Sequence, residues 1–276
     1  MWDHPSSAVT SLPVQCADAC RLTLVWAFDR VRNRHAPCKQ AHQADLPLML
    51  GFQSIPRIGI DESGKGDYFG PLVIASAFVS PDREPDLKLL QVRDSKRISD
   101  GRILEMAGDI RVICPHRIVS IGPERYNTLY AKIKNLNRLL AWGHARALEN
   151  LLEQVPCELA IADQFGDERY VQRALMEQGK TVRLVQQPKA EADLAVAAAS
   201  ILARAEFLTR LRRLSEEVGA TLPKGASNAV ELAAKMIVKK HGEAGLGRVA
   251  KLHFRTTQTI LRDFPQSHKD SPASSS

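Results

Sequence analysis

The sequence predicts an α/β layered fold, and two observations lead to this prediction. Segments rich in β-branched residues alternate with helical segments from about residue 57 to residue 240. Such alternation is typical of a sheet covered by helices. The 276 residues are enough for one large domain or two small ones, and the composition (44% hydrophobic, 25% charged) is ordinary for a globular protein.

The strands are expected where β-forming residues lie between turn residues. Residues 57–61 and 72–79 are the first two, and the Phe-Gly-Pro turn between them predicts a hairpin. Three further strands are expected at 117–121, 158–163 and 181–186.

The helices are expected where apolar residues recur every three or four positions. Ser99 can cap a helix that runs to residue 110, Pro123 opens a helix to about residue 134, and Asn135 opens the next. Three more helices are expected: 168–178 closed by Gly179, a long helix from Ala190 whose small residues suit close packing, and 226–240.

The two ends of the chain differ from this alternating region. Residues 1–54 contain no Glu and three of the five Cys, and no periodic pattern continues there beyond residues 22–28. We therefore expect a poorly ordered extension over 1–54 and one folded domain over 55–264. Residues 265–276 are polar, and we expect them to be a disordered tail.

The charge distribution favours a polyanionic partner. Lys and Arg outnumber Asp and Glu by 38 to 31, and the pI is near 9.3. Residues 224–262, called the basic segment below, carry eight Lys or Arg and only two Glu. This segment is either a surface for a phosphate backbone or an ordinary solvated helical face.

The cysteines and the apolar runs favour a cytoplasmic protein that is not bound to a membrane. The five Cys form no CxxC pair, and their odd number argues against a closed disulfide framework. The longest early apolar run, 22–28, is too short to span a bilayer. It also lacks the basic flank of a signal peptide.

Residues 57–73, RIGIDESGKGDYFGPLV, hold the clearest chemical signal. An apolar strand runs into Asp61 and Glu62, and the glycine-bracketed Lys65 follows. Carboxylates bind hard divalent cations, and an open glycine loop lets a phosphate approach peptide N–H groups. Neighbours on a strand point to opposite faces, so we expect Glu62 at the strand terminus, where the following turn swings it back. The alternative is a strand that ends in an ordinary polar turn.

Two more acids are expected near this pair. Asp163 closes the strand 158–163, and Glu191 opens the long helix. Because ligands bind where the carboxyl ends of parallel strands meet, the four carboxylates could form one cluster. Such a cluster needs cations, and two Mg²⁺ or Mn²⁺ ions would clamp a phosphodiester. The pattern indicates a metal-dependent nuclease, unless Asp163 only caps a turn and Glu191 only caps its helix.

These sequence blocks resemble the type 2 ribonuclease H family, and within it the ribonuclease HIII group, over about residues 55–262. DESGKGDYFGPLV at 61–73 matches the family's first block. The further matching blocks are DSK at 94–96, KAEADLAVAAASILAR at 189–204, LPKGAS at 222–227 and VAKLHF at 249–254.

The resemblance implies an RNase H-like fold with a central mixed β-sheet flanked by helices and a helical C-terminal part. It also implies that residues 55–264 are a catalytic domain that cleaves the RNA strand of RNA/DNA hybrids with Mg²⁺ or Mn²⁺ and leaves 3′-hydroxyl and 5′-phosphate ends. We expect this domain to act as a monomer. The metal-binding and catalytic residues that the resemblance implies are Asp61, Glu62, Asp163 and Glu191. The substrate-binding residues that it implies are Ser63, Gly64, Lys65, Gly66, Ser95, Lys96, Lys189, Lys224, Lys251 and His253.

The residues leave several questions open. Asp193 rivals Glu191 as the fourth acid because it lies two residues along, although the motif alignment favours Glu191. Ribonuclease HIII usually carries an N-terminal domain that resembles the TATA-binding protein, and the extension 1–54 is too short for one. Cleavage at single ribonucleotides embedded in duplex DNA, as in ribonuclease HII, is a second candidate activity. A non-catalytic hybrid-binding protein is a third candidate, and a resolvase or transposase on the same fold is a fourth.

Overall fold

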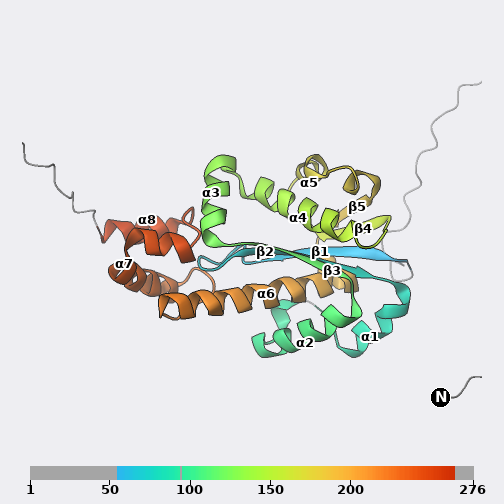
Figure 1. Ribbon diagram of the computed structural model, residues 1–276, viewed down its shortest axis with the longest axis horizontal. Coiled ribbons are helices and arrows are strands. Elements are labelled where there is room, and N and C mark those ends of the chain that lie inside the picture. The colour runs from blue at the N-terminus through green and yellow to red at the C-terminus, as the bar shows by residue number, and fades with distance from the viewer. Residues whose placement is uncertain (1–54, 94, 265–276) are drawn as a thin grey trace, which may run out of the picture. The chain divides into compact units, whose positions relative to one another are not determined.

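A five-stranded sheet lies between two layers of helices (Figure 1). This computed structural model describes residues 55–93 and 95–264, all within one unit of the chain. The expectations for residues 1–54, Asp94 and residues 265–276 lie outside the described residues. In the part that is described, no helix is long and apolar enough to cross a bilayer.

The sheet is mixed, in the order β3-β2-β1-β4-β5. β1 (Arg57–Ser63), β2 (Leu72–Val79) and β3 (His116–Ile121) pair antiparallel. β4 (Leu159–Asp163) and β5 (Arg183–Gln187) continue the sheet parallel to β1. The predicted hairpin, the five strands and the mixed sheet are confirmed. Because β1 and β4 are parallel neighbours, their carboxyl ends meet at one edge of the sheet.

Alternating side chains on the strands divide the core into two parts. Ile58 and Ile60 of β1 pack with the buried face of α4 (Leu136–Leu152), which α3 (Pro123–Ile133) and α5 (Glu168–Ala174) extend. The opposite face of the sheet, represented by Val73 of β2, packs against a second layer. That layer consists of α6 (Leu194–Val218), α2 (Asp100–Ile113) and α1 (Glu84–Leu89).

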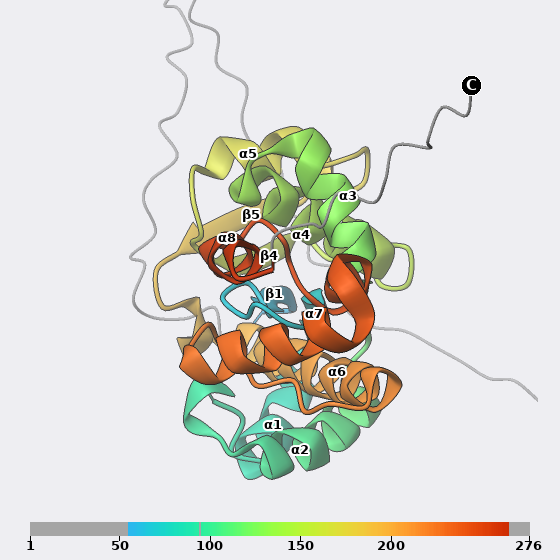
Figure 2. The same ribbon diagram turned by 90° about the vertical axis from the view of Figure 1, so that its left-hand side faces the viewer.

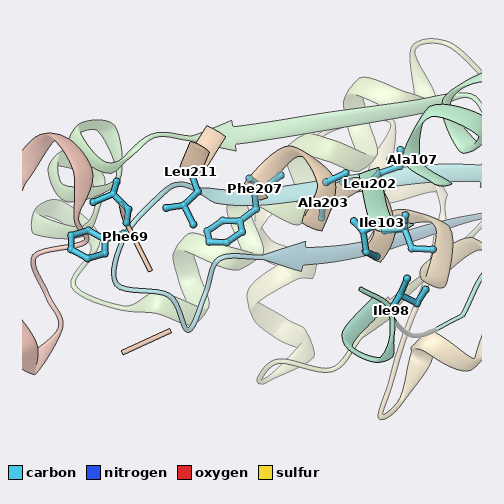
Figure 3. Close-up of a cluster of buried hydrophobic side chains, with 14 of the residues drawn as sticks. Phe69, Ile98, Ile103, Ala107, Leu202, Ala203, Phe207 and Leu211 are labelled. Atoms are coloured by element: carbon cyan, nitrogen blue, oxygen red, sulfur yellow. The ribbon is translucent and has the colours of Figure 1, made fainter. Parts of the chain in front are cut away.

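α6 lies close to β1 because the facing residues are small. A methyl group on Gly59 would lie 2.0 Å from the backbone carbonyl carbon of Ala195, so only glycine fits there. The next turns of α6 fill the core beside α2, and Figure 3 shows Leu202, Phe207 and Leu211 among the buried side chains. This packing brings the polar residues of α6 to the edge where β1 ends.

The C-terminal part is helical, as predicted, and lies at one end of the sheet (Figures 1 and 2). α7 (Asn228–Val249) is longer than the predicted 226–240 and is interrupted at Gly242, whose φ of 70° is left-handed. α8 (Arg255–Arg262) follows it. Neither α8 nor α1 was predicted, since both are short helices.

The prediction of a helix from Ala190 was wrong at its start. Residues Ala190–Ala192 form a 3₁₀ turn, and α6 begins only at Leu194. The reason is Asp193, whose Oδ1 accepts hydrogen bonds from the backbone N–H groups of Ala195 (2.8 Å) and Val196 (3.4 Å). Such an N-cap outweighs the helix propensity of the alanines before it.

The predicted helix 168–178 also ends early, at Ala174. Glu149 of α4 explains this, because its Oε1 accepts hydrogen bonds from the N–H groups of Met176 (2.7 Å) and Gly179 (2.9 Å). These bonds hold the chain after Ala174 in a non-helical path. The predicted caps are confirmed, since the side chains of Ser99 and Asn135 accept from the first turns of α2 and α4.

Candidate active site

A cavity of about 360 Å³ opens where β1 and β4 end, beside the middle of α6. Most of the residues implied by the resemblance line it, including the whole stretch from Asp61 to Gly66. Acidic and basic side chains are equal in number in this lining: Asp61, Glu62, Asp67 and Asp163 against Lys65, Lys96, Arg204 and Lys224. The cavity can therefore hold both cations and a phosphate-bearing chain.

Asp61 lies on the α6 side of β1. Burial raises the pKa of its carboxyl, and the negative charges of Glu62 and Asp163 raise it further. Hydrogen bonds from Ser200 and from the N–H of Glu62 lower it. The resulting pKa is about 7. The bond from the Glu62 N–H to Asp61 Oδ1 is 2.8 Å long. Asp61 is thus close enough to two other acids for their charges to act on it.

Glu62 has its partners on the other face of the sheet. Its Oε2 accepts a hydrogen bond from Nε2 of His144 on α4 (2.9 Å), and its Oε1 pairs with Nζ of Lys65 (2.7 Å). Burial tends to raise the pKa of Glu62, but the bonds and charges of His144 and Lys65 lower it to about 2. The prediction that the following turn swings Glu62 back was wrong. β1 runs on to Ser63 with Glu62 opposite Ile74, so Glu62 keeps the alternating orientation of a strand residue.

His144 is a site residue that the sequence analysis did not select. Its side chain is fully buried on α4, and its ring lies 4.6 Å from the ring of Phe165. The only signal in the sequence is a polar residue among the core positions of an amphipathic helix. Nothing in the sequence pairs it with Glu62, which is 82 positions away.

Asp163 ends β4 and lies between the pair Asp61 and Glu62 and the turn that carries Glu191. Its Oδ1 accepts a hydrogen bond from the N–H of Ala190 (3.2 Å). Glu191 is the next residue in the 3₁₀ turn and is half-buried, but neither it nor Lys189 lines the cavity. Among the described residues, no set of three His, Cys, Asp or Glu side chains is arranged to hold a metal ion.

Asp193, the rival of Glu191, has a structural role. Its Oδ2 pairs with Nε of Arg57 (2.6 Å), and its Oδ1 caps α6. Arg57 is fully buried and also pairs with Glu84 (2.7 Å). Both carboxylate oxygens of Asp193 therefore already have partners that join β1 to α6.

The glycine loop is defined as residues 64–71, and its first four residues line the cavity. Gly64 has a φ of 85°, and a methyl group on it would lie 2.2 Å from the carbonyl oxygen of Pro71, so this position requires glycine. The loop is joined to the C-terminal part, because Asp67 Oδ1 accepts from the N–H of Gly225 (2.7 Å).

The opposite wall carries cations held by hydrogen bonds. Arg204 of α6 donates to the carbonyl oxygen of Ser95 (2.5 Å) and to Asp100 (2.7 Å). Lys224 pairs with the same Asp100. The hydroxyl groups of Ser95 and Ser200 are 2.7 Å apart, which connects this wall to the helix beside Asp61.

Two more of the implied substrate-binding residues, Lys251 and His253, do not line the cavity. Lys251 is 0% exposed, and its Nζ donates to the carbonyl oxygen of Gly70 (2.6 Å). The ring of His253 packs 4.3 Å from the ring of Tyr130 and 5.4 Å from that of Tyr126. Lys251 therefore cannot reach a phosphate from this position, and His253 lies in an aromatic cluster.

Comparisons with known proteins show what the chain is similar to. The family model described as Ribonuclease HII matches residues 58–257. A ribonuclease HIII of Protochlamydia amoebophila is 48% identical over 206 residues, which are 75% of this chain and 68% of that protein. A ribonuclease HIII of Chlamydia pneumoniae is 43% identical over 209 residues, covering 74% and 70% of the two chains. The crystal structure of Bst-RNase HIII in complex with Mn²⁺ superposes with a TM-score of 0.72 at 36% identity, covering 77% of this chain and 71% of that one.

Proposed function

The chain belongs to the ribonuclease HII family, and we propose that the cavity around Asp61, Glu62 and Asp163 is its active site. As a relative of ribonuclease HIII proteins, it is a ribonuclease H, an endoribonuclease acting on RNA/DNA hybrids. The observation that supports the site most strongly is the meeting of two parallel strand ends in one cavity, where carboxylates from both strands face lysines.

The family depends on divalent metal ions, and we infer that Asp61, Glu62, Asp163 and Glu191 hold them here. The donors fit, because carboxylate oxygens are the ligands of hard cations. The raised pKa of Asp61, caused by burial and by the charges of Glu62 and Asp163, is the electrostatic condition that a cation relieves. Bound Mg²⁺ or Mn²⁺ would activate the attacking water and stabilise the leaving oxygen.

Two contacts support Glu191 over Asp193 as the fourth acid. The Ala190 N–H bond to Asp163 holds the turn that carries Glu191 beside the cluster. Asp193 has both oxygens engaged by Arg57 and by the start of α6. Turning the half-buried Glu191 side chain is a smaller change than breaking the buried ion pair of Asp193.

The remaining lining residues suit a nucleic-acid strand. The Ser63–Gly66 backbone is open toward the cavity, and we propose that its peptide groups contact the RNA strand beside the scissile bond, where the 2′-hydroxyl distinguishes RNA from DNA. Lys65, Lys96 and Lys224 would bind phosphates on either side. Cleavage is proposed to leave 3′-hydroxyl and 5′-phosphate ends. We also propose that the protein acts as a monomer, and in the cytoplasm, since the cysteine pattern suits a reducing compartment.

Cleavage of three labelled substrates in Mg²⁺ or Mn²⁺ tests this function: a long RNA/DNA hybrid, a DNA duplex with one ribonucleotide, and double-stranded RNA. We expect cleavage of the RNA strand of the hybrid at several positions and none of double-stranded RNA. Preferred cleavage of the single-ribonucleotide duplex would instead assign the ribonuclease HII type of activity. Hybrid binding without cleavage in either metal would contradict the proposal.

A further inference from the structure

We propose that Lys251 is a positioning residue, which holds the glycine loop (residues 64–71) in place for cleavage from inside the protein. This inference rests on the proposed function, because it assumes that the loop contacts the RNA strand. The family resemblance implied that Lys251 binds the substrate, but the structure places it behind the loop, away from solvent.

The contacts of the Lys251 side chain are with backbone oxygens of the loop. Its Nζ donates to Gly70 O at 2.6 Å and lies 3.4 Å from Phe69 O and 3.5 Å from Pro71 O. An ammonium group has three donors and no acceptor, so three converging carbonyl oxygens match it. Nζ also lies 5.8 Å from the ring centre of Tyr126.

Burying a lysine without a carboxylate partner is costly, and the cost is visible here. Burial lowers the pKa of Lys251 to about 7, against an opposing influence from Asp67. A side chain that made only apolar contacts would fill this space at less cost. What the lysine adds is a set of hydrogen bonds that fixes three successive carbonyl groups of the loop.

Backbone bonds around Lys251 complete the attachment of the loop to the C-terminal part. The N–H of Lys251 donates to Tyr68 O (2.9 Å), and the N–H of Gly70 donates to Val249 O (2.9 Å). The Tyr68 hydroxyl lies 3.0 Å from Thr257 Oγ1. The loop is thus paired with the chain on both sides of Lys251.

The same loop carries the residues that line the cavity. The Pro71 carbonyl group that Lys251 approaches is also the group against which Gly64 packs. Lys65 follows Gly64, and its Nζ pairs with Glu62. A shift of the Gly70 and Pro71 carbonyl groups would therefore move Gly64 and change the ion pair between Lys65 and Glu62.

Replacing Lys251 by Met keeps an unbranched, flexible side chain that is one heavy atom shorter, and it removes the donors. We expect kcat on the hybrid to fall at least about tenfold with KM within about twofold, since misplaced catalytic geometry affects turnover more than binding. Hydrogen exchange should become faster at the amides of Tyr68 and Gly70, which bond to Gly225 and Val249 in the wild type. Lys235→Met is the control on α7. It loses a partly exposed ion pair with Asp263 and should change none of these quantities.

Three results would overturn the inference. In Lys251→Met, the slope of log affinity for the hybrid against log salt concentration could fall by about one unit, which would show that Lys251 contacts a phosphate. Unchanged exchange at Tyr68 and Gly70 would show that it does not hold the loop, and faster exchange with unchanged kcat would show that the loop position does not matter for cleavage. Hydrogen exchange does not depend on catalysis. An inactive wild type would therefore contradict the proposed function, and exchange at Tyr68 and Gly70 would still show whether Lys251 holds the loop.

If Lys251→Met does not fold, Thr257→Val tests whether the position of the loop matters for cleavage. This substitution removes the partner of the Tyr68 hydroxyl and keeps Lys251. Faster exchange at Tyr68 together with a kcat reduced about threefold or more would support the inference. Wild-type kcat with faster exchange at Tyr68 would overturn it, because the position of the loop would then not matter for cleavage.

Discussion

The hydrogen bond between His144 and Glu62 allows a quantitative test of the site. His144→Phe removes the Nε2 donor 2.9 Å from Glu62 Oε2 and keeps an aromatic ring of similar size beside Phe165. A hydrogen bond to a charged group contributes about 1.5–3 kcal/mol. Glu62 retains its ion pair with Lys65, so we expect the lower end of this range, about 1.5 kcal/mol. If that energy orients the carboxylate during cleavage, the rate should fall about tenfold.

Single-turnover cleavage of a long hybrid at saturating Mg²⁺ or Mn²⁺ measures this loss, and urea unfolding shows whether the variant is folded. His144→Gln is the matched control, because its amide nitrogen can again donate to Glu62, and it should recover most of the rate. A His144→Phe rate within about twofold of the wild type would show that this hydrogen bond does not contribute to cleavage. So would a His144→Gln variant as slow as His144→Phe, since the donor would then be irrelevant.

A protein that begins at Ser54 should stay folded and cleave the hybrid at the wild-type rate. Circular dichroism and gel-based cleavage measure these two properties. A large loss of hybrid affinity would show that residues 1–54 bind substrate. Above pH about 7, the free energy of unfolding should rise with pH more in the wild type than in Lys251→Met. The reason is that the pKa of Lys251 is about 7 in the folded protein and 10.5 for an ordinary lysine, so between these two pH values the unfolded chain binds more protons than the folded chain. Urea unfolding at several pH values measures this, and parallel pH profiles of the two proteins would contradict it. Gly64→Ala should lower the free energy of unfolding by about 2–4 kcal/mol, since it adds a methyl group 2.2 Å from Pro71 O at a φ of 85°. Urea unfolding measures this free energy, and a value within about 0.5 kcal/mol of the wild type would contradict that packing.

The acidic end of β1 could be predicted from the sequence, because strand patterns and turn residues are local signals. Asp61 and Asp163 each end an apolar run, and the parallel pairing of β1 with β4 then brings them together. The start of α6 could not be predicted in the same way. Alanines favour a helix from Ala190, but the cap and ion pair of Asp193 determine the boundary, and the partner of that pair, Arg57, is 136 positions away.

The surroundings of the acids were beyond the reach of sequence patterns. His144 belongs to a helix whose apolar face was evident, but only the packing of α4 on the sheet brings it to Glu62. Lys251 lies in the basic segment, where a lysine is ordinarily exposed. Its burial follows from three loop carbonyl groups that are 180 to 182 positions away and form a site for an ammonium group only in the folded chain.

The substitution Asp61→Asn tests whether the carboxylates at the ends of β1 and β4 hold the metal ions for hybrid cleavage. The rate of hybrid cleavage in Mg²⁺ or Mn²⁺ should fall at least about a hundredfold, on the order of 3 kcal/mol, because an amide is an uncharged and poorer ligand. Hybrid affinity and the unfolding curve should stay close to those of the wild type. Near-wild-type turnover by Asp61→Asn in either metal would show that Asp61 does not hold a metal ion for cleavage.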